Sequence, residues 1–187
     1  PISSLYASVP YIGAETLWAN LGGASFAGAG IRIAILDSGV NIAHPMFNDT
    51  GYTYPSGYPK GDTRYTSRKV IAARTYIRPY DPPMANEHTP MPGSNGSGHG
   101  THMAGIAAGN VITATYRGIS QPISGVAPRA YLMNYRIFYP TAADKPEVAY
   151  TAEILRAIED AVNDGAQVLC NAWSSATPRP PLASPEA

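Results

Sequence analysis

The hydrophobic positions of this chain fall into short continuous runs separated by stretches with helical spacing. Residues 31–36 are apolar except for Arg32, and similar runs occupy residues 130–138 and 167–171. A run without polar alternation is typical of a strand covered on both faces, as in a parallel sheet. We therefore predict three buried strands at these positions and a further strand at 69–76.

Three segments carry helix signals. The strongest follows Thr151, its expected N-cap, and ends at the Asn-Asp-Gly sequence of residues 163–165. Its apolar residues share one helical face: Ile154, Leu155, Ile158, Ala161 and Val162. A small-residue helix at 99–108 is expected to pack tightly against its neighbours, and a short helix is expected at 15–21. Strands alternating with helices indicate an α/β fold with a parallel sheet.

The region 48–98 interrupts this alternation with a stretch rich in Pro, Gly, Tyr and Asn. We expect a long functional or surface loop there. The total of 187 residues fits one domain. The last four residues, Ser-Pro-Glu-Ala, have the pattern of a helix start, with an N-cap, a proline and an acid in the first turn. We therefore expect the chain to be truncated, with residues 1–187 the N-terminal portion of a longer domain.

Composition narrows the function classes. The formal net charge is +0, so no overall field favours nucleic acid, and we expect no nucleic-acid partner. No apolar run approaches the roughly 20 residues of a membrane span, and we expect no membrane partner. Cys170 is the single cysteine, which excludes an internal disulfide.

Two polar residues stand where chemistry is expected. Asp37 directly follows the apolar run at 31–36, and α/β sheets place their sites at the carboxyl ends of strands. Alone, Asp37 is more readily a turn-forming aspartate. His99 opens a helix, whose dipole disfavours the imidazolium ion and keeps the ring available as a base. Gly98 and Gly100 are expected to leave open space beside it for a substrate.

A metal site is the weaker alternative for this region. His99 and His102 lie one helical turn apart, but no further His, Cys or carboxylate stands at ligand spacing. We expect His102 to be structural, pointing into the sheet or bonding to a carbonyl.

Taken together, the segments resemble a known family. Asp-Ser-Gly from Asp37, and His-Gly-Thr-His-x-Ala-Gly from His99, resemble the Asp and His motifs of the subtilisin-like serine proteases (subtilases, peptidase S8). Residues 41–47 resemble the His-Pro segment after the family's Asp, and residues 125–128 match its Gly-Val-Ala-Pro turn. The resemblance covers most of residues 9–175. It implies a doubly wound, mostly parallel sheet with helices on both faces, left incomplete in this chain.

The resemblance implies a serine endopeptidase with an Asp-His-Ser triad. Carried over, Asp37 orients His99, and His99 is the general base for a serine. The family's Gly-Thr-Ser motif is absent from residues 1–187, and Ser174 and Ser175 are poor substitutes because no strained turn surrounds them. We therefore expect this chain to be inactive alone and its parent protein to be active. The alternative is a catalytically dead binding module with the same fold.

The resemblance also implies substrate and cofactor features. The family's substrate-binding wall corresponds to Ala172, Trp173 and Ser174, where Ala and Ser replace the usual Ser and Gly. For Trp173, simple core packing is the competing interpretation. A common family calcium site takes an acid where this chain has Met46, so we expect that site to be empty and predict no cofactor. Asp49, Asp62 and Asp81 are expected to be turn residues rather than calcium ligands.

The expected partners follow from the family and from the missing half. They are a polypeptide substrate and the remaining part of the catalytic domain. An exposed sheet edge is expected, through which copies of the chain could self-associate. The family resemblance implies secretion.

Overall fold

The structure is a computed structural model that describes residues 5–174. Its main sheet has five parallel strands within this part of the chain, in the order β2-β3-β6-β1-β7. In chain order the strands are β1 (Arg32–Asp37), β2 (Lys60–Gly61), β3 (Val70–Thr75), β6 (Tyr131–Arg136) and β7 (Val168–Cys170). The predicted strands at 31–36, 69–76, 130–138 and 167–171 all exist.

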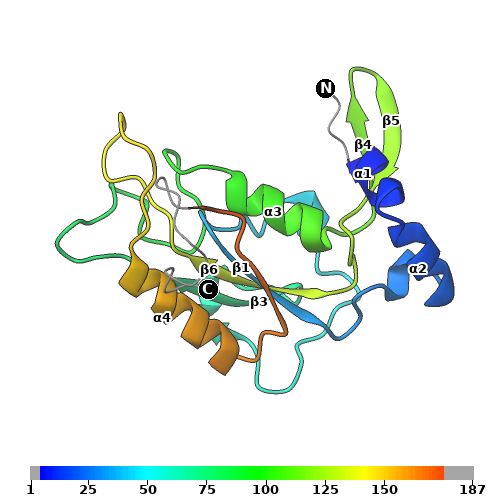
Figure 1. The fold of residues 1–187 in the computed structure, drawn as a ribbon, viewed down its shortest axis with the longest axis horizontal. Coiled ribbons are helices and arrows are strands. Elements are labelled where there is room, and N and C mark those ends of the chain that lie inside the picture. The colour runs from blue at the N-terminus through cyan, green and yellow to red at the C-terminus, as the bar shows by residue number, and fades with distance from the viewer. Residues whose placement is uncertain (1–4, 175–187) are drawn as a thin grey trace.

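Two helices cover opposite faces of the sheet, as Figure 1 shows: α3 (His99–Ala108) and α4 (Thr151–Asn163). Alternate residues of β1 enter two separate cores. Ala34 and Leu36 pack on the α4 side, whereas Ile33 and Ile35 pack on the α3 side. Burial on both faces explains the continuous apolar run of β1. The expected α/β fold, a mostly parallel sheet with helices on both faces, is confirmed.

The helix predictions hold in outline and fail in two details. Helix α3 spans the predicted residues 99–108, and its small residues Ala104, Gly105 and Ala108 are buried. Helix α4 begins at Thr151, so the prediction that Thr151 is the N-cap is wrong; Tyr150 holds that position without a side-chain bond. Val162 is 58% exposed, because it lies outside the sheet-facing stripe that Ile154, Ala157 and Ala161 form.

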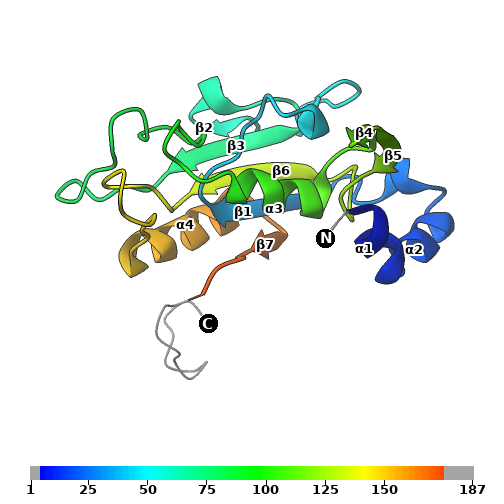
Figure 2. The same cartoon turned by 90° about the horizontal axis from the view of Figure 1, so that it is seen from above.

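The burial predicted for strand β7 is not observed. Val168 is 47% exposed. The reason is its place at the end of the sheet order, where it pairs with β1 alone among the described strands. The expected exposed edge is present in this part of the chain, and Figure 2 shows β7 at that edge.

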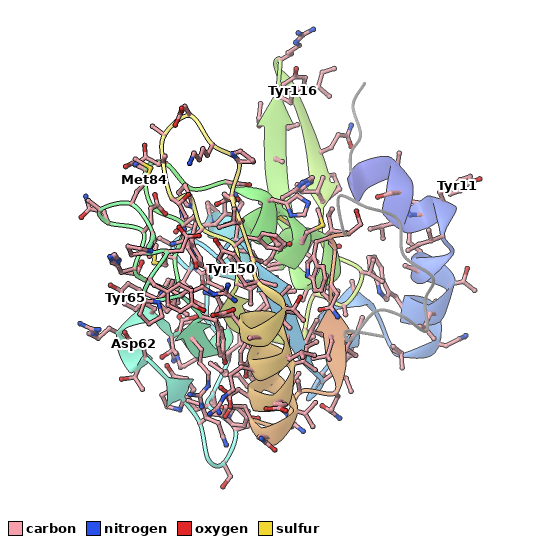
Figure 3. The ribbon with its side chains drawn as sticks, turned by 60° about the vertical axis from the view of Figure 1, so that its left-hand side comes forward. Tyr11, Asp62, Tyr65, Met84, Tyr116 and Tyr150 are labelled. Carbon is pink, nitrogen blue, oxygen red and sulfur yellow. The ribbon has the colours of Figure 1, made fainter. Side chains whose placement is uncertain are left out.

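Several elements had no counterpart in the sequence prediction. They are α1 (Leu5–Tyr11) and the antiparallel hairpin of β4 (Ile112–Tyr116) and β5 (Ile119–Ile123). Helix α2 (Ala14–Asn20) matches the short helix expected at 15–21. Arg117 and Gly118 both have positive φ, as the two-residue turns that favour hairpins require. Figure 3 shows Tyr11 and Tyr116 projecting outward at this end of the molecule.

The region 48–98 is mostly loop, as expected, with short pieces of structure. Besides β2 and β3 it holds the 3-10 turn η3 (Thr63–Tyr65), and two further turns of this kind, η1 (Ala24–Phe26) and η2 (Pro45–Phe47), precede it. Lys69, just before β3, is fully buried. Its ammonium group donates to the Tyr52 hydroxyl and to the carbonyls of Pro128 and Ala130 at 2.7–2.8 Å. Lys69 therefore ties this region to the start of β6.

Candidate active site

Asp37 ends β1 at the carboxyl edge of the sheet, and it is 2% exposed. Its carboxylate accepts a hydrogen bond from the Ser38 N–H at 2.7 Å, and its carbonyl accepts one from the Ile137 N–H at 2.9 Å. The chain then turns at Gly39, whose φ of 99° is one that side chains rarely adopt. Strand pairing and this turn together aim the Asp37 side chain out of the sheet edge.

His99 faces this carboxylate from the first residue of α3. Its Nδ1 lies 2.9 Å from both carboxylate oxygens of Asp37. Because a carboxylate only accepts hydrogen bonds, Nδ1 carries the proton and Nε2 is left with the lone pair when the ring is neutral. The imidazole side chain is 46% exposed, so a reacting group can reach it. The arrangement can take up a proton and stabilise the resulting imidazolium.

Two serines hold the start of α3 against the end of β1. The Ser38 hydroxyl accepts from the Gly100 N–H and donates to the Ser97 carbonyl, each at 3.0 Å. The Ser97 hydroxyl in turn accepts from the His99 N–H at 2.9 Å. These side chains satisfy N–H groups that a helix start leaves without internal partners.

The expectation about open space holds at Gly98 only. A Cβ at Gly98 would meet nothing within 4 Å. A Cβ at Gly100 would lie 2.6 Å from the Gly39 carbonyl and 3.0 Å from Cβ of Asp37. Gly100 therefore makes room for the backbone next to Asp37, and the prediction that it opens a path for substrate is wrong.

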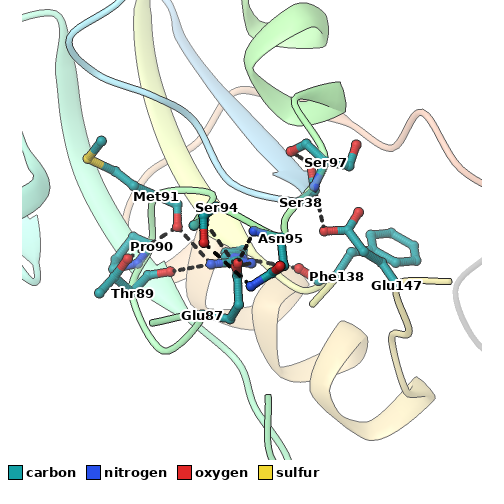
Figure 4. A network of polar contacts seen from close by, with 12 residues as sticks. Ser38, Glu87, Thr89, Pro90, Met91, Ser94, Asn95, Ser97, Phe138 and Glu147 are labelled. Carbon is teal, nitrogen blue, oxygen red and sulfur yellow. Dashed lines mark hydrogen bonds and ion pairs between the residues drawn. The ribbon is translucent and has the colours of Figure 1, made fainter. Parts of the chain in front are cut away.

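The loop before His99 is anchored by a fully buried ion pair. Arg136 pairs with Asp37 in the strand register, and its Nη2 lies 2.5 Å from Oε2 of Glu87. The same guanidinium donates to the carbonyls of Thr89, Met91 and Phe138. Figure 4 shows the loop folded around Glu87, with Ser38, Ser97 and Glu147 to one side.

The Glu87 carboxylate completes this anchor. It also accepts the N–H groups of Gly93 and Asn95. Burial alone would raise the pKa of Glu87, but the Arg136 guanidinium and these two N–H groups hold it below its ordinary value. Glu87 therefore stays ionised and keeps the loop in one conformation.

Sequence reasoning missed both members of this pair. Arg136 is the one charged residue inside the mostly apolar run 130–138, which was a visible signal of a buried partner. Glu87 carried no such signal, because single acids are ordinary in polar loops. The pairing became evident only when β6 was placed beside β1.

The proposed substrate wall lies directly after β7. The Trp173 indole N–H donates to the Leu36 carbonyl at 3.0 Å, and its ring meets Phe138 edge-on at 6.2 Å. Trp173 is thus packed beside the strand that carries Asp37. Ala172 and Ser174 are exposed. Ser175 and the helix start expected at 184–187 lie outside the described residues.

No metal centre is evident in the described part of the chain. Within residues 5–174, no group of three or more His, Cys, Asp or Glu side chains could hold a metal ion. His102 is exposed, so the prediction that it points into the sheet is wrong. Met46 is 5% exposed and packs in the α3-side core. Asp49 and Asp62 pair with neighbouring arginines, at 3.0 and 2.7 Å.

A buried aspartate bonded to an accessible histidine, at the carboxyl edge of a parallel sheet, defines an α/β protein equipped for acid–base chemistry. The model of the subtilase family (peptidase S8) matches residues 28–186. The chain therefore belongs to the subtilase family, and the resemblance seen in its motifs is confirmed.

Curated relatives support this membership. Subtilisin-like protease SBT2.1 of Arabidopsis thaliana is 32% identical over 187 residues, which cover 88% of this chain and 21% of that protein. Minor extracellular protease Vpr of Bacillus subtilis is 32% identical over 162 residues, which cover 87% of this chain and 16% of that protein. The chain thus spans about a fifth of the length of the curated relatives it matches.

Two solved structures are also similar. MycP3 protease, from a type VII (ESX-3) secretion system, is 27% identical with a TM-score of 0.41 and covers 83% of this chain and 35% of that one. Fervidolysin from Fervidobacterium pennivorans is 21% identical with a TM-score of 0.45, and the match covers 82% of this chain and 18% of that one. In the described helices, no segment is both long and apolar enough to cross a membrane.

Proposed function

We propose that the whole protein is a serine endopeptidase and that Asp37 and His99 are the acid and base of its catalytic triad. The observation that carries this proposal is the pair of 2.9 Å contacts between Nδ1 of His99 and the buried Asp37 carboxylate. Family membership supports the same chemistry. The remaining part of the catalytic domain supplies the serine and the groups that stabilise the oxyanion.

In the proposed mechanism, His99 takes part in each proton transfer. Nε2 of His99 takes the proton of the serine hydroxyl as its oxygen attacks the peptide carbonyl, and Asp37 stabilises the imidazolium that forms. The imidazolium then gives this proton to the leaving amine. Water, activated by the same nitrogen, hydrolyses the acyl-enzyme. The sequence of residues 1–187 holds no Gly-Thr-Ser motif, so we propose that this chain alone is inactive.

The proposal extends to substrate, partners and location. The substrate is a polypeptide whose backbone passes Ala172, Trp173 and Ser174. The edge strand β7, 47% exposed at Val168, is the surface where the rest of the domain or a second copy pairs. Secretion is proposed because an extracellular protease is among the relatives.

An activity-based probe tests this function. A fluorophosphonate forms a covalent bond with a serine only when a working base activates it. The full-length gene product should be labelled, while its His99→Ala variant and residues 1–187 alone should not be. A folded full-length protein that resists labelling contradicts the proposal and favours the catalytically dead binding module. Labelling of residues 1–187 would show that the nucleophile lies within them.

A further inference from the structure

Glu147 is a half-buried carboxylate on the segment between β6 and α4. Its backbone is held in place by an isolated antiparallel bridge, in which Tyr139 and Val148 exchange two hydrogen bonds of 3.1 and 3.0 Å. Tyr139 is 1% exposed, so the bridge is anchored in the core. Glu147 therefore projects from a rigid support, although the segment has no regular secondary structure around it.

The carboxylate of Glu147 reaches across to the loop that precedes His99. Its Oε1 accepts the N–H of Ser97 at 3.0 Å. Ser97 is the residue whose hydroxyl accepts the His99 N–H and whose carbonyl accepts the Ser38 hydroxyl. A single side chain thus fixes the residue that joins the start of α3 to the end of β1. Figure 4 shows Glu147 beside Ser97 and Ser38.

This position is unfavourable for a carboxylate. Burial raises the pKa of Glu147, and the negative charges of Asp37 and Glu87 raise it further. Arg136 is the nearby cation, but its guanidinium is already paired with Glu87 and bonded to three carbonyls. Among the described residues, Glu147 forms no ion pair of its own. An apolar side chain would avoid this cost, so the reach of the Glu147 side chain to Ser97 needs a local reason.

We propose that Glu147 is a positioning residue for His99, acting through the Ser97 N–H. This inference rests on the proposed function, in which His99 is the base. The Glu87–Arg136 pair anchors the loop near residues 87–95, whereas Glu147 holds its last residue before the Gly98 that leads into α3. Without Glu147, Ser97 can shift, and the start of α3 loses its fixed distance from Asp37. A misplaced base lowers the rate of the chemical step while leaving substrate binding largely unchanged.

Four variants of the full-length gene product separate the effect of the Glu147–Ser97 hydrogen bond from the effect of the negative charge. Glu147→Gln keeps an oxygen that accepts the Ser97 N–H. Glu147→Ala removes it, and Glu147→Asp keeps the charge but is one methylene too short. Asp144→Asn is the matched control, because it removes an exposed carboxylate from the same segment. The readouts are kcat and KM for cleavage of a peptide amide substrate, and the hydrogen exchange of the Ser97 amide, measured in peptides that cover residues 95–103.

The proposal predicts a distinct pattern. Glu147→Ala and Glu147→Asp should lower kcat about tenfold or more with KM nearly unchanged, and should speed exchange of the Ser97 amide by about tenfold. Glu147→Gln and Asp144→Asn should stay within about threefold of wild type in both readouts. Should the alanine variant fail to fold, the aspartate variant carries the comparison.

Three results would overturn the proposal: unchanged exchange in the alanine and aspartate variants, unchanged kcat despite faster exchange, or a glutamine variant as impaired as alanine. Hydrogen exchange needs no catalytic activity. If the wild-type protein neither cleaves peptides nor reacts with a fluorophosphonate, the proposed function fails. Hydrogen exchange would still test the positioning role of Glu147 separately, because unchanged exchange in the alanine and aspartate variants would refute it.

Discussion

Removing the charge of Glu87 should destabilise the fold at the sheet edge that carries Asp37 and His99. In Glu87→Gln, the Arg136 guanidinium stays fully buried and loses its only anionic partner among the described residues. The amide oxygen of glutamine can accept only part of what the carboxylate accepted from Arg136, Gly93 and Asn95. Breaking a buried ion pair from one side typically costs about 3–5 kcal/mol, because an uncompensated charge remains.

The destabilising effects of substituting Glu87 and Arg136 should not add, because both substitutions remove the same ion pair. Arg136→Met leaves the Glu87 carboxylate buried without its cation and leaves the Phe138 and Thr89 carbonyls without the guanidinium donor, while the Met91 carbonyl keeps the Thr89 hydroxyl. The double variant also removes the guanidinium from the Phe138 and Thr89 carbonyls, but it leaves no buried charge. Its destabilisation should therefore fall short of the sum of the single variants by about 3 kcal/mol.

Thermal unfolding followed by circular dichroism measures these differences. For a chain of this size, about 3–5 kcal/mol corresponds to a fall of roughly 6–20 °C in Tm. The pKa of Glu87 lies below its ordinary value of 4.5 in the folded protein. Its stabilising contribution is therefore present above pH 4.5 and is lost as the pH falls through the folded value, so the gap between wild type and Glu87→Gln should narrow in acid.

Two results would refute this reasoning. One is a Glu87→Gln variant that loses less than about 1 kcal/mol at neutral pH, the range of an exposed ion pair. The other is full additivity of the two substitutions, which would mean that Glu87 and Arg136 act independently.

Two further predictions concern Lys69 and Gly100. Burial lowers the pKa of Lys69 from 10.5 to about 7 in the folded protein, so the unfolded chain binds more protons between these values. Stability should therefore rise as the pH increases from about 7 to 9, with a total effect on the order of 5 kcal/mol if the whole interval were crossed. Urea unfolding at several pH values checks this, and a Lys69→Met variant with the same slope as wild type would contradict it. Gly100→Ala should push α3 away from β1, cost about 1–3 kcal/mol and abolish fluorophosphonate labelling of the full-length protein, because its Cβ would lie 2.6 Å from the Gly39 carbonyl. Gly105→Ala is the matched control, since its Cβ would meet only Sδ of Met46 at 3.6 Å, and equal labelling of both variants would rule out the steric argument.

Much of the central architecture could be predicted from local patterns. The apolar runs of β1, β3 and β6 and the small-residue pattern of α3 each depend on a few consecutive residues. These elements can be recognised in the sequence because side chains in strands and helices repeat with fixed periods. Asp37 and His99 could be singled out for the same reason, since each stands at the end or start of such an element.

Other features depended on contacts between distant residues. The exposure of Val168 follows from the edge position of β7, and that of Val162 from the rotation of α4 against the sheet. The hairpin of β4 and β5 was missed because its strands are short and largely exposed, without the apolar run of a buried strand. Neither periodicity nor composition reports where an element lies in the sheet.

By itself, the sequence determined the order of the main strands and helices and singled out Asp37 and His99 as the proposed acid and base, because those signals are local. Only the tertiary structure decided what holds that acid and base together. The register that places Arg136 opposite Asp37 joins residues about 100 positions apart. The buried contact of Arg136 with Glu87 and the reach of Glu147 to Ser97 each join residues about 50 positions apart. Such contacts arise when the packed sheet brings distant loops to one edge, and no local pattern in the sequence encodes them.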